Sequence, residues 1–311
     1  MGKIVVTGGA GFVGSHLVDA LLLEGNEVIV IDNMSTGTRE NLKHEESNPN
    51  LQVIEHDITL PLDLSGIDAI YNLACPASPP HYQADPLQTL KTNFQGVLNM
   101  LELAKKNGAS FLQASTSEIY GDPLEHPQRE SYWGNVNTLG PRSCYDEGKR
   151  VAETLVYEYK KLGLDAKIVR IFNTYGPRMN FEDGRVVSNF VLQALRNEPL
   201  TVYGKGDQTR SFCYVSDLVS GIKKTMEKEN FFGPVNLGNP LELTVEEIGR
   251  KIIAMTGSSS ELVYKPLPQD DPIRRKPDIL LAQTELQWEP KVSLGEGLGK
   301  IIDDFKSRLA K

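Results

Sequence analysis

The chain has 311 residues and a formal net charge of −8 at pH 7, because 33 lysine and arginine residues stand against 41 aspartate and glutamate residues. Hydrophobic residues make up 40% of it, and no apolar run approaches the roughly 20 residues that cross a bilayer, which excludes a membrane protein and predicts one large or two ordinary soluble domains. The acidic balance also argues against a general nucleic-acid binder, which needs clustered lysine and arginine.

The cysteines and histidines predict neither disulfides nor a metal site. Cys75, Cys144 and Cys213 are odd in number and far apart, which is typical of reduced thiols in a cytoplasmic protein. Neither they nor the five histidines have the spacing of metal ligands. The apolar run at residues 3–7 lies too close to the first methionine for a signal peptide, and we expect a buried strand there.

A glycine-rich turn follows this first strand. Gly8, Gly11 and Gly14 lie between residues 3–7 and a helical apolar pattern at residues 15–22. In dinucleotide-binding folds this spacing gives a tight turn, a close backbone approach to a pyrophosphate and a close contact between helix and strand. The N–H groups at the start of the helix then face the phosphates. A purely structural loop is the alternative for the glycine triplet alone.

An acidic residue ends the second predicted strand, at residues 27–31. Asp32 lies 24 positions after Gly8, where a carboxylate can accept both ribose hydroxyls of NAD and would repel the additional phosphate of NADP. NAD is therefore the expected cofactor, although an ordinary strand-end acid or a helix cap would also explain Asp32. Asp57, after a third strand at 51–55, is expected to accept a hydrogen bond from the adenine amine.

Strand and helix patterns continue to alternate through strands at residues 69–73, 110–113 and 167–172. This alternation predicts an α/β fold, a Rossmann-type doubly wound parallel sheet with helices on both faces. In such sheets ligands bind at the carboxyl ends of the strands, so the residues that follow each strand are the candidates for a site.

The pattern changes after residue 178, where helical stretches at 186–196 and 245–255 alternate with connections rich in glycine and proline. This change predicts a smaller, mostly helical C-terminal domain that binds the substrate. The predicted division is an NAD-binding domain at 1–174, rejoined by residues near 211–238, and a substrate-binding domain at 175–210 and 239–311.

Three residues with acid–base potential follow the fifth strand and begin a later helix. Thr116 comes after the strand at 110–113, and Tyr145 and Lys149 are four residues apart, on one face of a predicted helix. A nearby ammonium group lowers the pKa of a phenol, so a tyrosinate can serve as a base near neutral pH. A solvated helix face is the alternative for Tyr145 and Lys149 alone, but the glycine motif and Thr116 favour a proton relay.

These motifs resemble those of the extended short-chain dehydrogenase/reductase superfamily of nucleotide-sugar enzymes. Within it, nearly the whole chain is similar to the UDP-glucuronate decarboxylase family, also called UDP-xylose synthases. The similarity is carried by CPASPPHY (75–82), LKTNFQGVLNML (90–101), ASTSEIYGDP (114–123), CYDEGKRVAET (144–154), RIFNTYGPRM (170–179), DGRVVSNFVLQAL (183–195), PLTVYGKGDQTRSFCYVSDLV (199–219) and RKPDI (275–279).

The resemblance implies a reaction. Tyr145, helped by Thr116 and Lys149, removes the proton of the sugar C4 hydroxyl while a hydride passes to NAD. The 4-ketone lies β to the C5 carboxylate, so carbon dioxide can leave, and the ketone is then reduced again to give UDP-xylose. The cofactor is expected to stay bound through the cycle, because the oxidation is temporary.

Ser117 and Glu118 separate this pattern from related enzymes. In NDP-glucose 4,6-dehydratases an aspartate at the position of Ser117 protonates the leaving C6 hydroxyl, and serine is a poor general acid. The 4-epimerases usually have a small residue at the position of Glu118, a group that in the decarboxylase pattern orients or protonates the sugar. A 4-epimerase or a 4,6-dehydratase is the alternative function, and a surface carboxylate is the alternative for Glu118.

An anionic substrate requires local cations in an acidic protein. The resemblance implies that Arg210 holds the pyrophosphate and that Arg275 binds near the phosphate or the glucuronate carboxylate. A solvated basic turn is the alternative for residues 274–276, because three adjacent cations cannot all enter one pocket. Asn173 and Arg185 are expected on the diphosphate side, and residues 200–203 along the uracil.

The same resemblance implies the remaining contacts. The expected NAD site comprises Gly8, Gly11, Phe12, Val13, Gly14, Asp32, Asn33, Ser35, Thr36, Gly37, Asp57, Ile58, Leu73, Ala74, Thr92, Ser115, Tyr145, Lys149, Phe172 and Arg178. The expected substrate site comprises Pro76, Ser78, Tyr82, Lys91, Thr116, Asn173, Arg185, Val187, Thr201, Tyr203, Arg210 and Arg275. In this superfamily the helices equivalent to residues 87–106 and 145–161 form a four-helix dimer interface, so a homodimer is expected.

Overall fold

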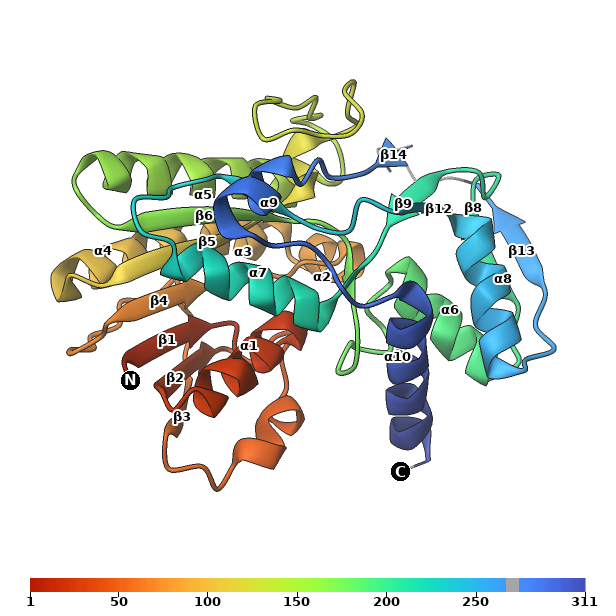
Figure 1. Ribbon diagram of the computed structural model, residues 1–311, viewed down its shortest axis with the longest axis horizontal. Coiled ribbons are helices and arrows are strands. Elements are labelled where there is room, and N and C mark those ends of the chain that lie inside the picture. The colour runs from red at the N-terminus through yellow and green to blue at the C-terminus, as the bar shows by residue number, and fades with distance from the viewer. Residues whose placement is uncertain (267–273, 311) are drawn as a thin grey trace.

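The computed structural model describes residues 1–266 and 274–310, and at its centre is a seven-stranded sheet of parallel strands (Figure 1). The strand order is β11-β6-β5-β4-β1-β2-β3. From β1 the chain moves outward through β2 and β3, and then outward in the other direction from β4, which confirms the predicted doubly wound α/β fold. The strands are β1 (Lys3–Thr7), β2 (Glu27–Asp32), β3 (Leu51–Glu55), β4 (Ala69–Asn72), β5 (Ser110–Thr116), β6 (Ala166–Ile171) and β11 (Val235–Leu237).

Helices cover both faces of the sheet (Figure 1). On β1, Val5 belongs to one buried apolar cluster and Val6 to another, because successive side chains of a strand point to opposite faces. The Val5 cluster includes side chains of α4 (Val97–Asn107) and α5 (Ser143–Lys161). The Val6 cluster includes side chains of α1 (Phe12–Leu23) and α7 (Val215–Glu227). Covering both faces explains why the central strands are apolar along their length rather than alternating.

Short helical segments connect the strands with these helices. They are the 3₁₀ helix η1 (Arg39–Glu45), α2 (Pro79–Ala84), α3 (Pro86–Lys91), the π-helical η2 (Thr92–Gly96), the 3₁₀ helix η3 (Ser117–Tyr120) and α9 (Leu280–Leu286). The last of these, α9, packs against α7 and β11. Segments far apart in the sequence therefore meet at the edge of the sheet that β11 forms.

The C-terminal part of the chain adds three longer helices and several short strands beside the sheet (Figure 1). Its helices α6 and α8 match the helical stretches that the sequence predicts. A capping box begins α8, because Thr244 Oγ1 accepts from Glu247 N at 3.1 Å and the Glu247 carboxylate accepts from Thr244 N at 2.7 Å. The elements are β7 (Thr174–Tyr175), α6 (Val186–Leu195), β8 (Leu200–Tyr203), β9 (Thr209–Ser211), β10 (Cys213–Tyr214), β12 (Glu242–Thr244), α8 (Val245–Thr256), β13 (Leu262–Lys265), β14 (Arg274–Arg275) and α10 (Leu294–Leu309).

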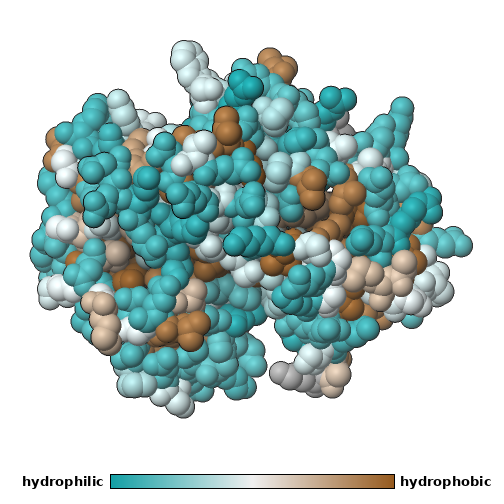
Figure 2. Space-filling view, in the orientation of Figure 1, coloured by the Kyte–Doolittle hydropathy of each residue, from teal (hydrophilic) through white to brown (hydrophobic). Residues whose placement is uncertain are grey.

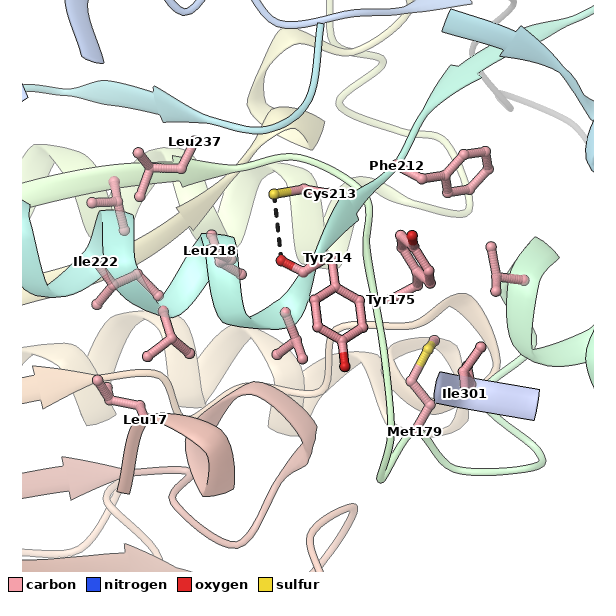
Figure 3. Close-up of a cluster of buried hydrophobic side chains, with 14 of the residues drawn as sticks. Leu17, Tyr175, Met179, Phe212, Cys213, Tyr214, Leu218, Ile222, Leu237 and Ile301 are labelled. Carbon is pink, nitrogen blue, oxygen red and sulfur yellow. Dashed lines mark hydrogen bonds between the residues drawn. The ribbon is translucent and has the colours of Figure 1, made fainter. Parts of the chain in front are cut away.

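One hydrophobic core joins the sheet to this smaller region. Figure 3 shows Leu17 of α1 and Leu218 of α7 in the same cluster as Tyr175, Tyr214 and Ile301, the last of them on α10. The rings of Tyr175 and Tyr214 meet edge to face, with centroids 5.7 Å apart. The core is therefore continuous between the sheet and the smaller region. The domain boundaries stay a prediction.

The surface in Figure 2 is mostly hydrophilic, with hydrophobic side chains scattered in small patches. Among the described residues, none of the helices has the length and apolar character needed to cross a membrane. Cys75, Cys144 and Cys213 are free thiols, as their spacing predicts.

Candidate active site

A cleft of about 1080 Å³ opens at the carboxyl ends of the sheet strands and extends to the smaller C-terminal region. The predicted catalytic residues line it, as do all the residues predicted to contact NAD and most of those predicted to contact the substrate. The fold therefore brings most of the residues that the sequence singles out to one cavity. Their individual roles stay predictions.

Two residues predicted to contact the substrate do not reach the cleft. Lys91 is the last residue of α3, and its side chain is exposed to solvent. Thr201 on β8 is held by Gln193 of α6, whose amide oxygen accepts from Thr201 N at 3.1 Å and whose amide nitrogen donates to Thr201 Oγ1 at 3.3 Å. Neither residue therefore belongs to the lining of the cleft, although both lie in segments whose sequence resembles the family.

The glycine turn between β1 and α1 leaves no space for side chains. Gly8 has a φ of +68°, and an added Cβ would lie 2.9 Å from the backbone nitrogen of Ala74. At Gly14 an added Cβ would overlap the carbonyl oxygen of Gly8. Gly11 caps α1 without a side chain, and the first helical residues, Phe12 and Val13, line the cleft. This cradle fits a pyrophosphate, which would take its hydrogen bonds from backbone N–H groups.

Asp32 at the end of β2 ties this turn to the sheet. Its carboxylate accepts from the N–H of Met34 at 2.9 Å and from the N–H of Ala10 at 3.0 Å. Burial raises the pKa of the Asp32 carboxyl, and these two hydrogen bonds oppose the rise. Each carboxylate oxygen has a second lone pair, so Asp32 can still accept from a ribose hydroxyl in the cleft.

Tyr145, Lys149 and Thr116 meet where α5 passes the end of β5. Lys149 Nζ donates to the carbonyl of Ala114 at 2.9 Å and lies 5.8 Å from the centroid of the Tyr145 ring. Burial raises the pKa of Tyr145 well above its usual value, whereas a hydrogen bond with Thr116 lowers it. Burial also lowers the pKa of Lys149. A buried phenol therefore needs additional positive charge nearby before it can act as a base.

Tyr82 on α2 stacks on Tyr145, with ring centroids 4.9 Å apart and planes 7° from parallel. Its hydroxyl is buried and has no hydrogen-bond partner, although the residue lines the cleft. Burial raises the pKa of this phenol, so Tyr82 is a neutral donor. A buried donor without a partner is costly, and a ligand hydroxyl or carboxylate in the cleft would satisfy it.

Glu118 on η3 lies between two arginines. Arg275 on β14 donates to both carboxylate oxygens, with its Nη2 at 2.8 Å from Oε2, and Arg142 donates to the same carboxylate. Burial opposes ionisation of Glu118, but the charges of Arg142 and Arg275 outweigh it and lower the pKa of Glu118 to about 2. A surface carboxylate is therefore the wrong reading of Glu118, and a solvated turn is the wrong reading of Arg275, which is 4% exposed.

The neighbouring strand brings a second predicted arginine to the same wall. β9 pairs with β14, and Arg210 lies in register with Arg275. Both side chains are buried and line the cleft, as does Arg185, which forms an ion pair with Asp183. The structure thus gathers cations from three segments of an acidic chain around one cavity.

A comparison with protein families gives a match to the NAD dependent epimerase/dehydratase family over residues 4–238. The chain belongs to this family. Among its members, UDP-glucuronic acid decarboxylase 1 of Arabidopsis thaliana is 59% identical over 308 residues, which cover 99% of this chain and 70% of that protein. Solved structures also superpose over almost the whole chain. A UDP-glucose 4-epimerase of Thermotoga maritima with UDP-glucose has a TM-score of 0.90, 33% identity and 99% coverage of both chains.

The second solved member is a UDP-glucuronic acid 4-epimerase of Bacillus cereus, in complex with UDP-glucuronic acid and NAD. It has a TM-score of 0.89 and 31% identity, and the match covers 98% of this chain and 99% of that one.

Sequence reasoning in terms of family motifs missed Arg142, three positions before Tyr145. Arg142 lies just before α5 and reaches Glu118, which comes 24 residues earlier in the chain. A lone arginine in a loop gives no spacing that predicts this contact. Only the fold brings the loop before α5 against η3.

A set of possible metal ligands lies away from these residues but is better explained as a charge network. Among the described residues, Asp19, His44 and Glu45 place one ligand atom each within 4.8 Å of one another. Arg178 Nη2 donates to Asp19 at 2.6 Å and lies 3.3 Å from His44 Nε2. A guanidinium at this position neutralises Asp19, so these contacts favour an ion pair over a bound cation.

Asp146, next to Tyr145, carries a carboxyl whose pKa is raised in the folded protein. Burial and the charge of Glu118 raise its pKa from 3.8 to about 8, while the charges of Arg142 and Arg275 oppose the rise. The unfolded chain releases this proton at lower pH than the folded one, so stability is lost as the pH rises from about 4 to about 8.

We therefore expect Asp146→Asn to increase the free energy of unfolding at pH 8 by roughly 1–3 kcal/mol. The increase should shrink as the pH falls and be absent below about pH 4, where the aspartate is protonated in both states. Urea denaturation of both proteins at several pH values measures it. A difference that does not change with pH would contradict this assignment.

Proposed function

We propose that this protein is a UDP-glucuronate decarboxylase, a carboxy-lyase that uses NAD to convert UDP-glucuronate to UDP-xylose. The observation that carries the proposal is the pair of Glu118 and Arg275 in the same cleft as Tyr145 and Lys149. Such a site offers a guanidinium for an acidic sugar beside the groups for proton transfer. The identity to a named decarboxylase supports this substrate, and a neighbour solved with UDP-glucuronic acid and NAD supports both ligands.

The glycine turn and Asp32 would hold the cofactor of this proposal. Backbone N–H groups of Phe12 and Val13 would hold its pyrophosphate, and Asp32 would accept from its ribose hydroxyls. A carboxylate at this position repels a 2′-phosphate, which favours NAD over NADP. When bound, NAD takes up a hydride from the sugar C4 and later returns it.

Tyr145 is the proposed base for the C4 hydroxyl. Its buried phenol donates to or accepts from Thr116, and the Lys149 ammonium beside the ring favours the ionised form electrostatically. The Lys149 ammonium donates a hydrogen bond to the Ala114 carbonyl, which keeps the ammonium close to Tyr145. Transfer of the hydroxyl proton to Tyr145 leaves an oxygen whose electrons form the C4 ketone as the C4 hydride departs.

The carboxyl group leaves once C4 is a ketone. The bond between C5 and the carboxyl carbon breaks, its electron pair passes into an enolate of C5 and C4, and carbon dioxide departs before a proton adds at C5. Because Glu118 is ionised and held by two arginines, its contacts support an orienting role rather than proton donation. Arg275, held by Glu118, would direct the sugar carboxylate.

The second candidate function is a 4-epimerase or a 4,6-dehydratase, which the overall likeness to solved members of both kinds favours. Incubation with UDP-glucuronate, UDP-glucose or dTDP-glucose separates these functions. The proposal predicts UDP-xylose from UDP-glucuronate and no change in UDP-glucose or dTDP-glucose, whose sugars carry no carboxylate. If UDP-glucose is epimerised or dTDP-glucose dehydrated while UDP-glucuronate is untouched, the second candidate is correct.

The proposal includes a homodimer and a cytoplasmic location. The three free cysteines support a reducing compartment. Leu87, Leu90 and Phe94 recur at helical spacing along α3 and η2 and are exposed, as is Tyr157 on α5. A four-helix interface between two copies would cover these apolar side chains.

We expect Phe94→Glu to convert the dimer to a monomer of 34.5 kDa, because a charge at the centre of this apolar face would be buried without a partner. Light scattering coupled to size exclusion measures the mass. Leu139→Glu is the matched control, since Leu139 is also an exposed apolar residue but lies in the loop before α5. A wild-type monomer, or a Phe94→Glu dimer, would contradict the interface.

A further inference from the structure

The strand that carries Arg275 is very short, so regular secondary structure alone holds the backbone of this residue only weakly. This strand, β14, has two residues and pairs on one side with β9, where Arg274 lies in register with Thr209 and Arg275 with Arg210. Two residues of pairing leave the direction of the following segment undetermined. Other contacts must therefore fix the backbone next to Arg275 in the chain.

Gln128 supplies those contacts. Its amide oxygen accepts from Lys276 N at 2.8 Å, and its own backbone N donates to the Lys276 carbonyl at 2.9 Å. The Gln128 carbonyl accepts from Asp278 N at 2.8 Å, and its amide nitrogen donates to the carbonyl of Glu125 at 2.7 Å. The residue is completely buried, and both ends of its side chain are satisfied. Gln128 thus joins the loop before α5 to the three residues that follow Arg275.

The attachment continues into the sheet. The Asn236 amide on β11 donates to the Gln128 carbonyl at 3.0 Å and to the Asp278 carbonyl at 3.1 Å. Its oxygen accepts from the Tyr120 hydroxyl at 2.8 Å, and Tyr120 ends the same 3₁₀ helix that carries Glu118. The two partners of the ion pair, Glu118 and Arg275, are therefore held in one hydrogen-bonded frame, in which Gln128 binds the backbone of Lys276, the residue directly after Arg275.

We propose that Gln128 is a positioning residue that sets where the Arg275 guanidinium lies. It thereby determines how strongly the cleft prefers a nucleotide with an acidic sugar over one with an uncharged sugar. This inference rests on the proposed role of Arg275 toward the sugar carboxylate. Gln128 does not line the cleft. Without its amide, Lys276 N and the Glu125 carbonyl lose their partners, and the backbone beside Arg275 can shift. Displacements of about 1 Å in such groups reduce activity by about 100-fold.

The test uses Gln128→Met, which keeps the length of the side chain and removes both hydrogen bonds. Calorimetric titration of the NAD-loaded protein, with Tyr145→Phe present in every variant so that no turnover occurs, compares UDP-glucuronate with UDP-xylose, whose sugar carries no charge. We expect the affinity for UDP-glucuronate to fall at least about 10-fold and that for UDP-xylose to change less than about 2-fold. Equal losses for both nucleotides, or no loss for either, would overturn the proposal.

Two further variants separate positioning from general stability. Asn107→Leu is the matched control, because the Asn107 amide also anchors a loop, through the Leu64 carbonyl at 3.0 Å and Ile67 N at 3.2 Å, but lies far from the cleft residues in the fold. It should lower the melting temperature without changing the selectivity between the two nucleotides. If Gln128 acts through Arg275, Gln128→Met should have no effect on UDP-glucuronate binding when Arg275 is already alanine, whereas additive losses would overturn the proposal.

Should Gln128→Met not fold, Gln128→Glu replaces it, because a carboxylate keeps the acceptor for Lys276 N and loses the donor to Glu125. The same selective loss for UDP-glucuronate is expected, and equal weakening of both nucleotides would overturn the proposal. Binding is measured without turnover, so this result is independent of whether the wild-type protein decarboxylates UDP-glucuronate. A wild-type protein that binds UDP-glucuronate but releases no carbon dioxide would refute the proposed function alone.

Discussion

Tyr145→Phe is expected to lower the turnover of UDP-glucuronate by about 10³-fold or more, because it removes the phenol oxygen that, when ionised, accepts the C4 proton. The ring would remain stacked on Tyr82, so the packing of α2 against α5 should be preserved. Release of carbon dioxide under saturating substrate measures the effect. Bound NAD, determined after denaturing the purified protein, should stay at the wild-type level.

Tyr82→Phe is the matched control for this result. It also removes one phenol hydroxyl from the same stacked pair but leaves the Tyr145 hydroxyl and its hydrogen bond with Thr116 in place. We expect a much smaller loss, expressed mainly as a higher KM, since Tyr82 would donate to bound substrate. Similar rates for Tyr145→Phe and the wild-type protein would show that another group takes the C4 proton, and loss of bound NAD would show that Tyr145 acts in cofactor binding.

Arg275→Ala is expected to reduce kcat/KM for UDP-glucuronate by about 10²–10³-fold, because a charge-assisted pair with a carboxylate in a buried site contributes several kcal/mol. Binding of UDP-xylose, whose sugar carries no charge, should change far less. The same substitution removes one of the two cations that hold the pKa of Glu118 near 2, so that pKa should rise while Arg142 still pairs with the carboxylate. Steady-state kinetics and titration of the two nucleotides measure these effects.

An equal loss of affinity for UDP-glucuronate and UDP-xylose would contradict the assignment of Arg275 to the sugar carboxylate. It would place the guanidinium on the diphosphate, which both nucleotides share. Arg210 provides the comparison, because it lies beside Arg275 in register and is proposed to bind the diphosphate. Arg210→Ala should therefore weaken both nucleotides to a similar extent.

The sequence predicts much of this fold because its local signals agree with the tertiary structure. The apolar runs of β1 and β2 are too short and too rich in valine and isoleucine for helices, and Gly8 and Gly14 tolerate no side chain where they lie. Asp32 lies at the predicted strand end, with its carboxylate on the glycine turn. Where a residue type is required by the backbone around it, position in the chain is enough to predict its place.

The rest of the site depends on contacts between distant segments, which spacing does not reveal. Arg142 and Arg275 meet on Glu118 although 133 positions separate the two arginines, and Gln128 reaches Lys276 across 148. Conversely, Lys91 and Thr201 lie in segments whose sequence resembles the family, yet neither residue lines the cleft. Side-chain direction at the end of a helix or in a short strand is decided by packing partners rather than by the motif.

The most direct test of the proposed function follows two labels in one reaction. UDP-glucuronate carrying ¹³C in the carboxyl group and deuterium at C4 is incubated with the protein and a trace of NAD, and the products are followed by nuclear magnetic resonance. The account predicts one ¹³CO₂ for each UDP-xylose formed, with the deuterium back at C4, because the oxidation at this carbon is temporary. Retention of the ¹³C in the sugar nucleotide, with or without inversion at C4, would contradict it.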